Sequence, residues 1–294
     1  MYKTAYQKTI KSLPFRILSA IWLVIKTAFL LYAVAFSLAG TLALYAAYQF
    51  VVAPLHQVKA LQNSNPKETA YMFRYRAAVR PPDTLVQKFM PLDSISTELQ
   101  QAVLAAEDDG FYTHPGFDIE AIFAAVECNR FQNEIKMGGS TITQQLAKNL
   151  FLTNDKSYER KYKEFVYALL MEKYLGKKRI LELYLNYAQW GKTVFGCEAA
   201  SRLYFKKSCR NLTRNEAALL AAVLAKPQKV SPMNPNSSFI EQRVAVIAAN
   251  LYFHHLIDDS GYTNLTGNPP PGKDSLGRLD TAGTPPRADS GKTQ

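Results

Sequence analysis

A short acidic segment holds the residue of this chain best suited to accept a proton. The segment is Glu107–Asp118, which reads EDDGFYTHPGFD and follows an apolar helical stretch. A carboxylate at the end of a helix meets the negative pole of the helix dipole, and apolar neighbours remove water from it. Both effects raise the pKa of Glu107 toward values useful for taking a proton from a hydroxyl. From spacing alone, a surface acid near a turn is the more frequent explanation of such a residue.

The other polar residues of this segment carry weaker signals. Asp108 and Asp109 could bind a substrate, or one of them could simply accept hydrogen bonds from backbone amides in the turn. His114 precedes Pro115-Gly116 and could carry a proton, although a histidine that stabilises the turn is more frequent.

A second segment, Gly139–Asn149, reads GSTITQQLAKN and has the signature of a helix start. Thr141 and Gln144 form a capping-box pattern, and the free N–H groups of such a start favour anions. A solvated face would explain Lys148 and Asn149, but not a cluster of Thr and Gln, which are mediocre surface choices in a helix. The segment therefore predicts a polar wall opposite the apolar Ile142, Leu146 and Leu150. Its members are Ser140, Thr141, Thr143, Gln144, Gln145, Lys148 and Asn149.

Cations follow at helical spacing. Lys156, Arg160 and Glu164 occupy successive turns, with Lys161 beside them. One explanation is a surface Arg160–Glu164 pair that stabilises the helix by about 0.2–0.5 kcal/mol. The other is a group of cations that faces a phosphate.

Composition limits the classes of partner and site. The chain has 294 residues and a formal net charge of +11, and residues 1–26 contain five bases and no acid. A moderately basic body suits phosphate or anionic lipid, or is simply a solvated surface. No arginine-rich stripe is present, so nucleic acid is not an expected partner. The three cysteines, Cys128, Cys197 and Cys209, lack metal-type spacing, and their odd number leaves at least one thiol unpaired or paired between chains.

Thr27–Val52 is a run of 26 residues without a charge. At about 1.5 Å per residue it can cross a hydrocarbon core of roughly 30 Å. It is longer than the apolar region of a cleaved signal peptide, which runs about 7–15 residues. Because basic residues precede it, the sequence predicts a single transmembrane helix at 27–52, a cytoplasmic basic segment at 1–26, and the rest of the chain across the membrane.

Helical spacing of apolar residues recurs beyond the membrane segment. It is clear in Ile95, Leu99, Val103 and Ala106, and Asp118 can cap a following helix. No run alternates long enough to predict a strand, so the expected fold class is mainly α. Further predicted helices begin at Thr141 and Tyr158 and cover Arg179–Asn186, Arg214–Ala225 and Phe239–Leu256.

The chain outside the membrane divides by composition into three parts. Residues 53–93 read as a polar connector and residues 94–260 as one domain. From residue 261 to residue 294, eleven of 34 residues are Gly or Pro, so we expect a disordered tail.

Five blocks of the chain resemble, in order, the motifs of the family-51 glycosyltransferases, which polymerise the glycan strands of bacterial peptidoglycan. The single anchor and the chain end soon after the fifth block resemble the monofunctional Gram-negative members. Two positions depart from the pattern, since Ala225-Lys226-Pro227 replaces Pro-Asn-Pro and Lys156 stands where Arg is frequent. The blocks are EDDGFYTHPG at 107–116, GSTITQQLAKN at 139–149, Arg160-Lys161 with Glu164, Lys177 with ILELYLN at 180–186, and AALLAAVL at 217–224.

The resemblance implies a lysozyme-like glycosyltransferase domain on the periplasmic side of the inner membrane, with lipid II as its substrate. Glu107 would deprotonate the 4-hydroxyl of an acceptor lipid II. That oxygen would attack the anomeric carbon of the growing chain with inversion, form a β-1,4 bond and release undecaprenyl pyrophosphate. Glu164 would be the second catalytic residue. The substrate would be bound by Asp108, Phe111, His114, Ser140, Thr141, Thr143, Gln144, Gln145, Lys148, Asn149, Lys156, Arg160 and Lys161.

The same resemblance bears on cofactors and partners. Because pyrophosphate leaves as a stable anion, cations can replace a general acid, and no cofactor is essential. A divalent cation, Mg²⁺ or Mn²⁺, is an option at Glu164. The expected partners are lipid II, the growing lipid-linked glycan, the membrane, and other cell-wall synthesis and division proteins.

Two rival functions are compatible with parts of the sequence. A lysozyme-like peptidoglycan hydrolase could share Glu107, but it would need that group as a proton donor and has little use for a cationic wall or a lipid anchor. A non-catalytic scaffold for the cell-wall machinery could use the same fold as a binding surface, although Glu107 and the intact second block argue against it.

Overall fold

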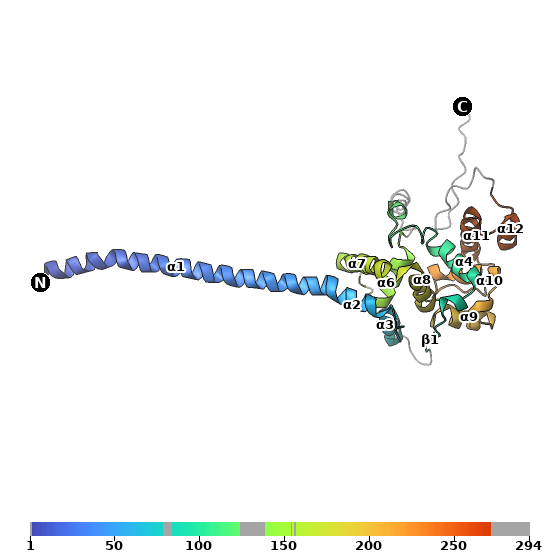
Figure 1. Ribbon diagram of the computed structural model, residues 1–294, viewed down its shortest axis with the longest axis horizontal. Coiled ribbons are helices and arrows are strands. Elements are labelled where there is room, and N and C mark those ends of the chain that lie inside the picture. The colour runs from blue at the N-terminus through green and yellow to red at the C-terminus, as the bar shows by residue number, and fades with distance from the viewer. Residues whose placement is uncertain (1, 79–83, 124–138, 154, 156, 272–294) are drawn as a thin grey trace, which may run out of the picture. The chain divides into compact units, whose positions relative to one another are not determined.

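A long N-terminal helix precedes the folded domain (Figure 1). The computed structural model describes residues 2–78, 84–123, 139–153, 155 and 157–271, and the chain divides into two units, Met1–Ala53 and Pro54–Gln294. The first unit contains α1 (Tyr2–Ala47) and the π-helical turn η1 (Tyr48–Val52). Among the described residues one helical span, Ile17–Ala60, is long and apolar enough to cross a membrane, with a mean hydropathy of 2.1 in its apolar window. The predicted segment 27–52 lies inside it.

The second unit is mainly α, as expected. Its helices are α2 (Ala53–Ala60), which begins one residue before the unit, α3 (Ala70–Ala78), η2 (Leu92–Ser94), α4 (Thr97–Glu107), α6 (Ile142–Phe151), α7 (Tyr158–Tyr174), α8 (Gly176–Tyr187), α9 (Cys197–Phe205), η3 (Cys209–Asn211), α10 (Arg214–Ala222), η4 (Val223–Ala225), α11 (Ser238–Phe253) and α12 (Asp259–Thr266). Residues 119–123 are also helical. The side chain of Asp118 accepts a hydrogen bond from the N–H of Ala121, which confirms the expected cap.

Two very short strands join distant parts of this unit. β1 (Val86–Gln87) pairs in parallel with β2 (Val194–Phe195), with Val86 opposite Val194. The sequence predicted no strand, because a strand of two residues is too short to produce a recognisable alternation.

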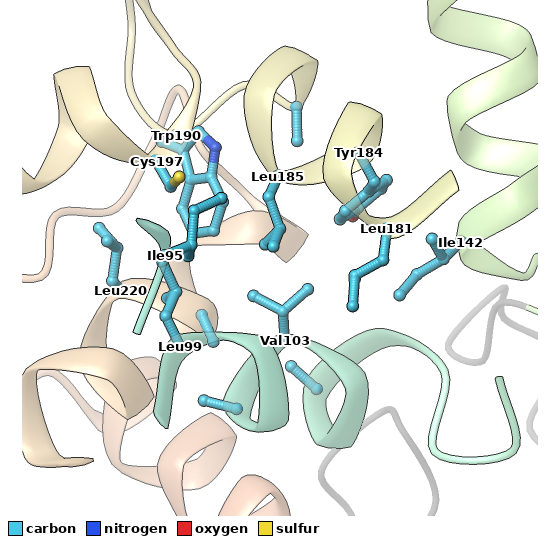
Figure 2. Packing of buried hydrophobic residues seen from close by; sticks show 14 of the residues in the cluster. Ile95, Leu99, Val103, Ile142, Leu181, Tyr184, Leu185, Trp190, Cys197 and Leu220 are labelled. Carbon is cyan, nitrogen blue, oxygen red and sulfur yellow. The ribbon is translucent and has the colours of Figure 1, made fainter. Parts of the chain in front are cut away.

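The core lies where two groups of helices meet. α4 packs against α10 and α11, and α6 packs against α7 and α8 (Figure 1). Figure 2 shows how Leu99 and Val103 of α4 lie in one cluster with Leu181 and Leu185 of α8. All four side chains are fully buried. This packing fixes the C-terminus of α4, and therefore Glu107, relative to α6 and α8.

Two expected boundaries differ from the structure. The connector at 53–93 contains α2, α3 and β1, and it belongs to the folded unit because Val58, Leu61 and Met72 are buried in the core. The tail expected from residue 261 begins inside α12, where Asp258 caps the helix by accepting a hydrogen bond from the N–H of Gly261. Residues 261–266 are therefore helical rather than disordered, and the expectation for 272–294 lies outside the described residues.

Candidate active site

Glu107 lies at the C-terminal end of α4 in a nearly closed environment. Only 12% of its side chain is exposed. Burial raises the pKa of the carboxyl above its usual range, while Arg243 and then Gln145 act in the opposite direction. Glu107, the residue expected to act as a base, is therefore a desolvated carboxylate. The alternative that Glu107 is an ordinary surface acid is wrong.

Each oxygen of Glu107 accepts a hydrogen bond from a different helix. Gln145 of α6 donates from Nε2 to Oε2 at 3.0 Å. Arg243 of α11 donates from Nη2 to Oε1 at 3.0 Å and to the carbonyl oxygen of Ala106 at 2.8 Å. Because a carboxylate has about four lone-pair positions, the group can still accept a proton from a third partner.

Tyr184 of α8 fixes the orientation of Gln145. Its hydroxyl donates to Oε1 of Gln145 at 3.0 Å, so that the amide nitrogen of Gln145 faces Glu107. Burial raises the pKa of Tyr184 well above its usual value, and the nearby Glu107 acts in the same direction. The hydroxyl therefore stays protonated and remains a donor at neutral pH.

Asp108 holds the turn after α4 against the start of α6. It is 7% exposed, its Oδ1 lies 2.8 Å from Nε2 of His114, and its Oδ2 accepts from the N–H of Ile142 at 2.9 Å. Nδ1 of His114 in turn accepts from the N–H of Gly116 at 3.1 Å. Asp108 and His114 are therefore joined to each other and to backbone groups, which is the alternative the sequence left open for both.

Several residues expected to bind substrate have partners inside the fold. Phe111 is fully buried, and Nζ of Lys177 lies 4.4 Å from the centre of its ring. The hydroxyl of Thr143, also fully buried, donates to Oε1 of Glu172 at 2.6 Å. These contacts give Phe111 and Thr143 a role in packing the site rather than an open face toward a ligand.

The start of α6 is the capping box that the sequence predicted. The hydroxyl oxygen of Thr141 accepts from the N–H of Gln144, and the Gln144 side chain accepts from the N–H of Thr141. Thr141 also donates to the carbonyl oxygen of Gly116 at 2.7 Å. Gln144 is only 3% exposed, and its side chain therefore serves to cap the helix. Ser140 and Asn149 are partly exposed.

A group of charges lies on α6 and α7. Lys148 follows Gln145 by one helical turn, so both lie on the same side of α6. Glu164 is buried and accepts from Nη1 of Arg160 at 2.7 Å and from Nζ of Lys161. Burial lowers the pKa of Lys148, and Glu164 is the main influence that raises it again. The structure thus brings Lys148, Arg160, Lys161 and Glu164 together, whereas Lys156 lies outside the described residues.

Glu164 fits the orientation of these cations better than it fits a metal. Both of its oxygens already accept hydrogen bonds from Arg160 and Lys161. Within the part of the chain that the structure describes, no three His, Cys, Asp or Glu side chains gather in a way that could hold a metal ion. Both oxygens of Glu164 are thus engaged with cationic side chains, and a divalent cation at this residue stays a prediction.

Sequence reasoning missed Arg243 as a residue of this site and did not single out Tyr184. Arg243 is 136 positions from Glu107, so no local spacing relates the two. A signal was present, because an arginine inside the apolar helix predicted at Phe239–Leu256 is unusual unless it is paired. Tyr184 lies in one of the five blocks, but its spacing gave it no distinct chemistry.

Comparisons with known proteins identify similar chains. A family model described as "Transglycosylase" matches residues 77–252. The chain is 42% identical over 233 residues, covering 77% of it and 93% of the relative, to a protein of Alcanivorax borkumensis named biosynthetic peptidoglycan transglycosylase. Relatives with the same name are 40% identical in Burkholderia lata (67% of this chain, 81% of the relative) and 43% identical in Thiobacillus denitrificans (62% and 79%).

Proposed function

Because this chain belongs to the transglycosylase family, we propose that it is a peptidoglycan glycosyltransferase that polymerises lipid II into β-1,4-linked glycan strands. The family and the mainly α fold expected from the motifs are both confirmed. The observation that carries the mechanism is the buried carboxylate of Glu107, whose partner Gln145 lies one helical turn before Lys148 on α6.

Glu107 acts as the general base in this proposal. It must be ionised to take the proton of the acceptor 4-hydroxyl, yet burial favours its neutral form. Arg243 and Gln145 donate to its two oxygens and so offset part of the cost of the charge. The result is a carboxylate with a raised pKa that remains ionisable, which is the state a base needs for a weakly acidic hydroxyl.

The bond changes follow from that proton transfer. The acceptor oxygen attacks the anomeric carbon of the donor as its proton passes to Glu107, and the bond between that carbon and the pyrophosphate oxygen breaks. The configuration at the anomeric carbon of the donor is inverted, and undecaprenyl pyrophosphate leaves with the bonding electron pair. The leaving group gains negative charge, and in this proposal Lys148, Arg160 and Lys161 stabilise that charge.

Glu164 orients Arg160 and Lys161 and favours the charged form of Lys148. Partial burial lowers the pKa of Lys148, and the carboxylate of Glu164 counteracts that shift. Glu164 is therefore a positioning residue, and Ser140 and Asn149 remain proposed contacts of the lipid-linked sugar. No cofactor is part of this proposal. Polymerisation measured with and without a chelator tests the divalent cation that the sequence left as an option at Glu164.

Location completes the proposal. We place the N-terminus in the cytoplasm and the domain on the periplasmic face of the inner membrane, supported by the apolar span Ile17–Ala60 and the five bases in residues 1–26. Anchoring to the same membrane as the lipid substrate raises the effective concentration of both. A periplasm-active reporter fused after Leu256 should be active, one fused before Lys11 should be inactive, and the reverse pattern would refute this topology. Other cell-wall synthesis and division proteins are its proposed partners.

Incubation of the purified full-length protein with labelled lipid II tests the function directly. Polymer supports the proposal, cleavage of finished glycan would indicate a hydrolase, and neither product would indicate a scaffold. Glu107→Gln should lower polymerisation at least about a hundredfold, the usual size of a general-base contribution, while lipid binding persists. Near-normal activity of a folded Glu107→Gln protein would show that another group is the base.

A further inference from the structure

Two cysteines that the proposed reaction does not use lie together in the core. Sγ of Cys197 and Sγ of Cys209 are 3.7 Å apart, and both residues are fully buried. Cys197 is the first residue of α9, and Cys209 is the first residue of η3. Both belong to the buried cluster that also contains Trp190, in which Figure 2 shows the Cys197 sulfur.

We propose that Cys197 and Cys209 form a disulfide bond when the domain is on the periplasmic side of the membrane, an inference that rests on the proposed topology. The two sulfurs must approach from 3.7 Å to about 2.0 Å, a shift that two side chains can share by small rotations. Exported domains meet an oxidising environment in which such pairs form and persist.

The surrounding hydrogen bonds hold the two cysteines close to each other. Glu198, next to Cys197, is fully buried, and its Oε2 accepts from the N–H of Cys209 and from the hydroxyl of Ser208, each at 2.9 Å. The hydroxyl of Ser201 donates to the carbonyl oxygen of Lys207 at 2.9 Å. These hydrogen bonds hold the backbone on both sides of the segment between the cysteines. The short distance between the sulfurs is therefore a fixed feature of the fold.

A metal is a weaker explanation of the pair. The described residues contain no group of three His, Cys, Asp or Glu side chains that could hold an ion, and two thiols alone do not make a zinc site. Packing as two small apolar side chains is the remaining alternative, and it differs from a disulfide by one measurable covalent bond.

The bond forms by two exchange steps. One cysteine sulfur, as thiolate, attacks the disulfide of an exported thiol oxidase and gives a mixed disulfide. The second cysteine then attacks that mixed disulfide, which leaves Cys197 and Cys209 joined and the oxidase as a dithiol. Two electrons pass to the oxidase, which takes up the two protons the cysteines lose. Burial raises the pKa of Cys197 well above its usual value, so a thiolate is scarce after folding and oxidation should precede the docking of η3.

The test counts thiols in the full-length protein. Cells that express it in a host with an oxidising periplasm are quenched with acid, denatured, and treated with a polyethylene-glycol maleimide. We expect a single labelled cysteine, Cys128, before reduction and three after it. Mass spectrometry of a digest should show the peptides of Cys197 and Cys209 joined and lighter by two hydrogens. The variant Cys128→Ser is the matched control and should keep that linkage.

Two further measurements separate the bond from its premise and from simple packing. A loop of this length should add about 5–10 °C to the melting temperature, so a reductant should lower the melting temperature of the parent protein and leave that of the Cys197→Ala/Cys209→Ala double variant unchanged. Labelling of both cysteines, or a linkage through Cys128, would overturn the proposal. If the reporter fused after Leu256 is active in that case, the topology stands and the disulfide alone is wrong; if it is inactive, both fail.

Discussion

Replacement of Arg243 by glutamine tests whether this residue sets the working pH of Glu107. The two side chains are 7% and 12% exposed, and their atoms Nη2 and Oε1 are 3.0 Å apart. Removing one partner of a buried ion pair typically costs about 3–5 kcal/mol. Glu107 can avoid much of that cost by taking a proton, and about 3 kcal/mol corresponds to roughly two pKa units. The pKa of Glu107, already raised by burial, should therefore rise further in Arg243→Gln.

The assay is the initial rate of lipid II polymerisation as a function of pH. The pH at which the rate rises to its plateau, the rising limb of the profile, should increase by about one to two units in Arg243→Gln. Below this pH the rate should be about 10–100-fold lower than that of the wild type, and it should recover at higher pH. Arg243→Lys keeps the charge and should return the limb most of the way. Arg214→Gln is the matched control, because Arg214 pairs with Glu98 at 2.7 Å at a partly exposed position. A limb that stays in place in folded Arg243→Gln would refute the reasoning.

Three other changes have distinct expected outcomes. Lys148→Ala should lower the rate at saturating lipid II by about 10²–10³-fold, as deletion of one oxyanion donor does, and an unchanged rate would defeat its assignment to the pyrophosphate. The folded pKa of Glu107 is raised, so the stability it contributes is present below about pH 4 and is lost as pH rises through the folded pKa; melting curves of wild type, but not of Glu107→Gln, should show this loss. Tyr184→Phe frees the Gln145 amide and should reduce the rate about 3–10-fold, in line with one hydrogen bond, at unchanged fold by circular dichroism.

Local features of the site could be predicted from the sequence because they depend on residues a few positions apart. The capping box of Thr141 and Gln144 is an example, since a helix start fixes which side chain meets which amide. The Arg160–Glu164 contact is another, four residues apart on α7. In both cases the spacing gave the contact correctly.

The chemical role of a polar residue was harder to predict than its helix. Gln144, Thr143 and Phe111 were expected at the substrate, and each has a partner within the fold. Spacing shows which face of a helix a residue occupies, but not which neighbouring element covers that face. Gln145, one position after Gln144, is turned instead toward Glu107, and only the contacts of α6 with α8 and with the end of α4 reveal the difference.

In this site the base and the cations each have a charged partner of their own. Burial pushes Glu107 and Lys148 toward neutrality in opposite directions, and Arg243 offsets the effect for one while Glu164 offsets it for the other. A direct pair between Glu107 and Lys148 would lower the pKa of the base and neutralise the cation that the leaving group needs. Separate partners allow a raised pKa at Glu107 while Glu164 favours the charged form of Lys148. It follows that Arg243→Gln should move the pH limb, whereas Lys148→Ala should lower the plateau and leave the limb in place, and a shift of the limb in both variants would show that the two pairs act as one.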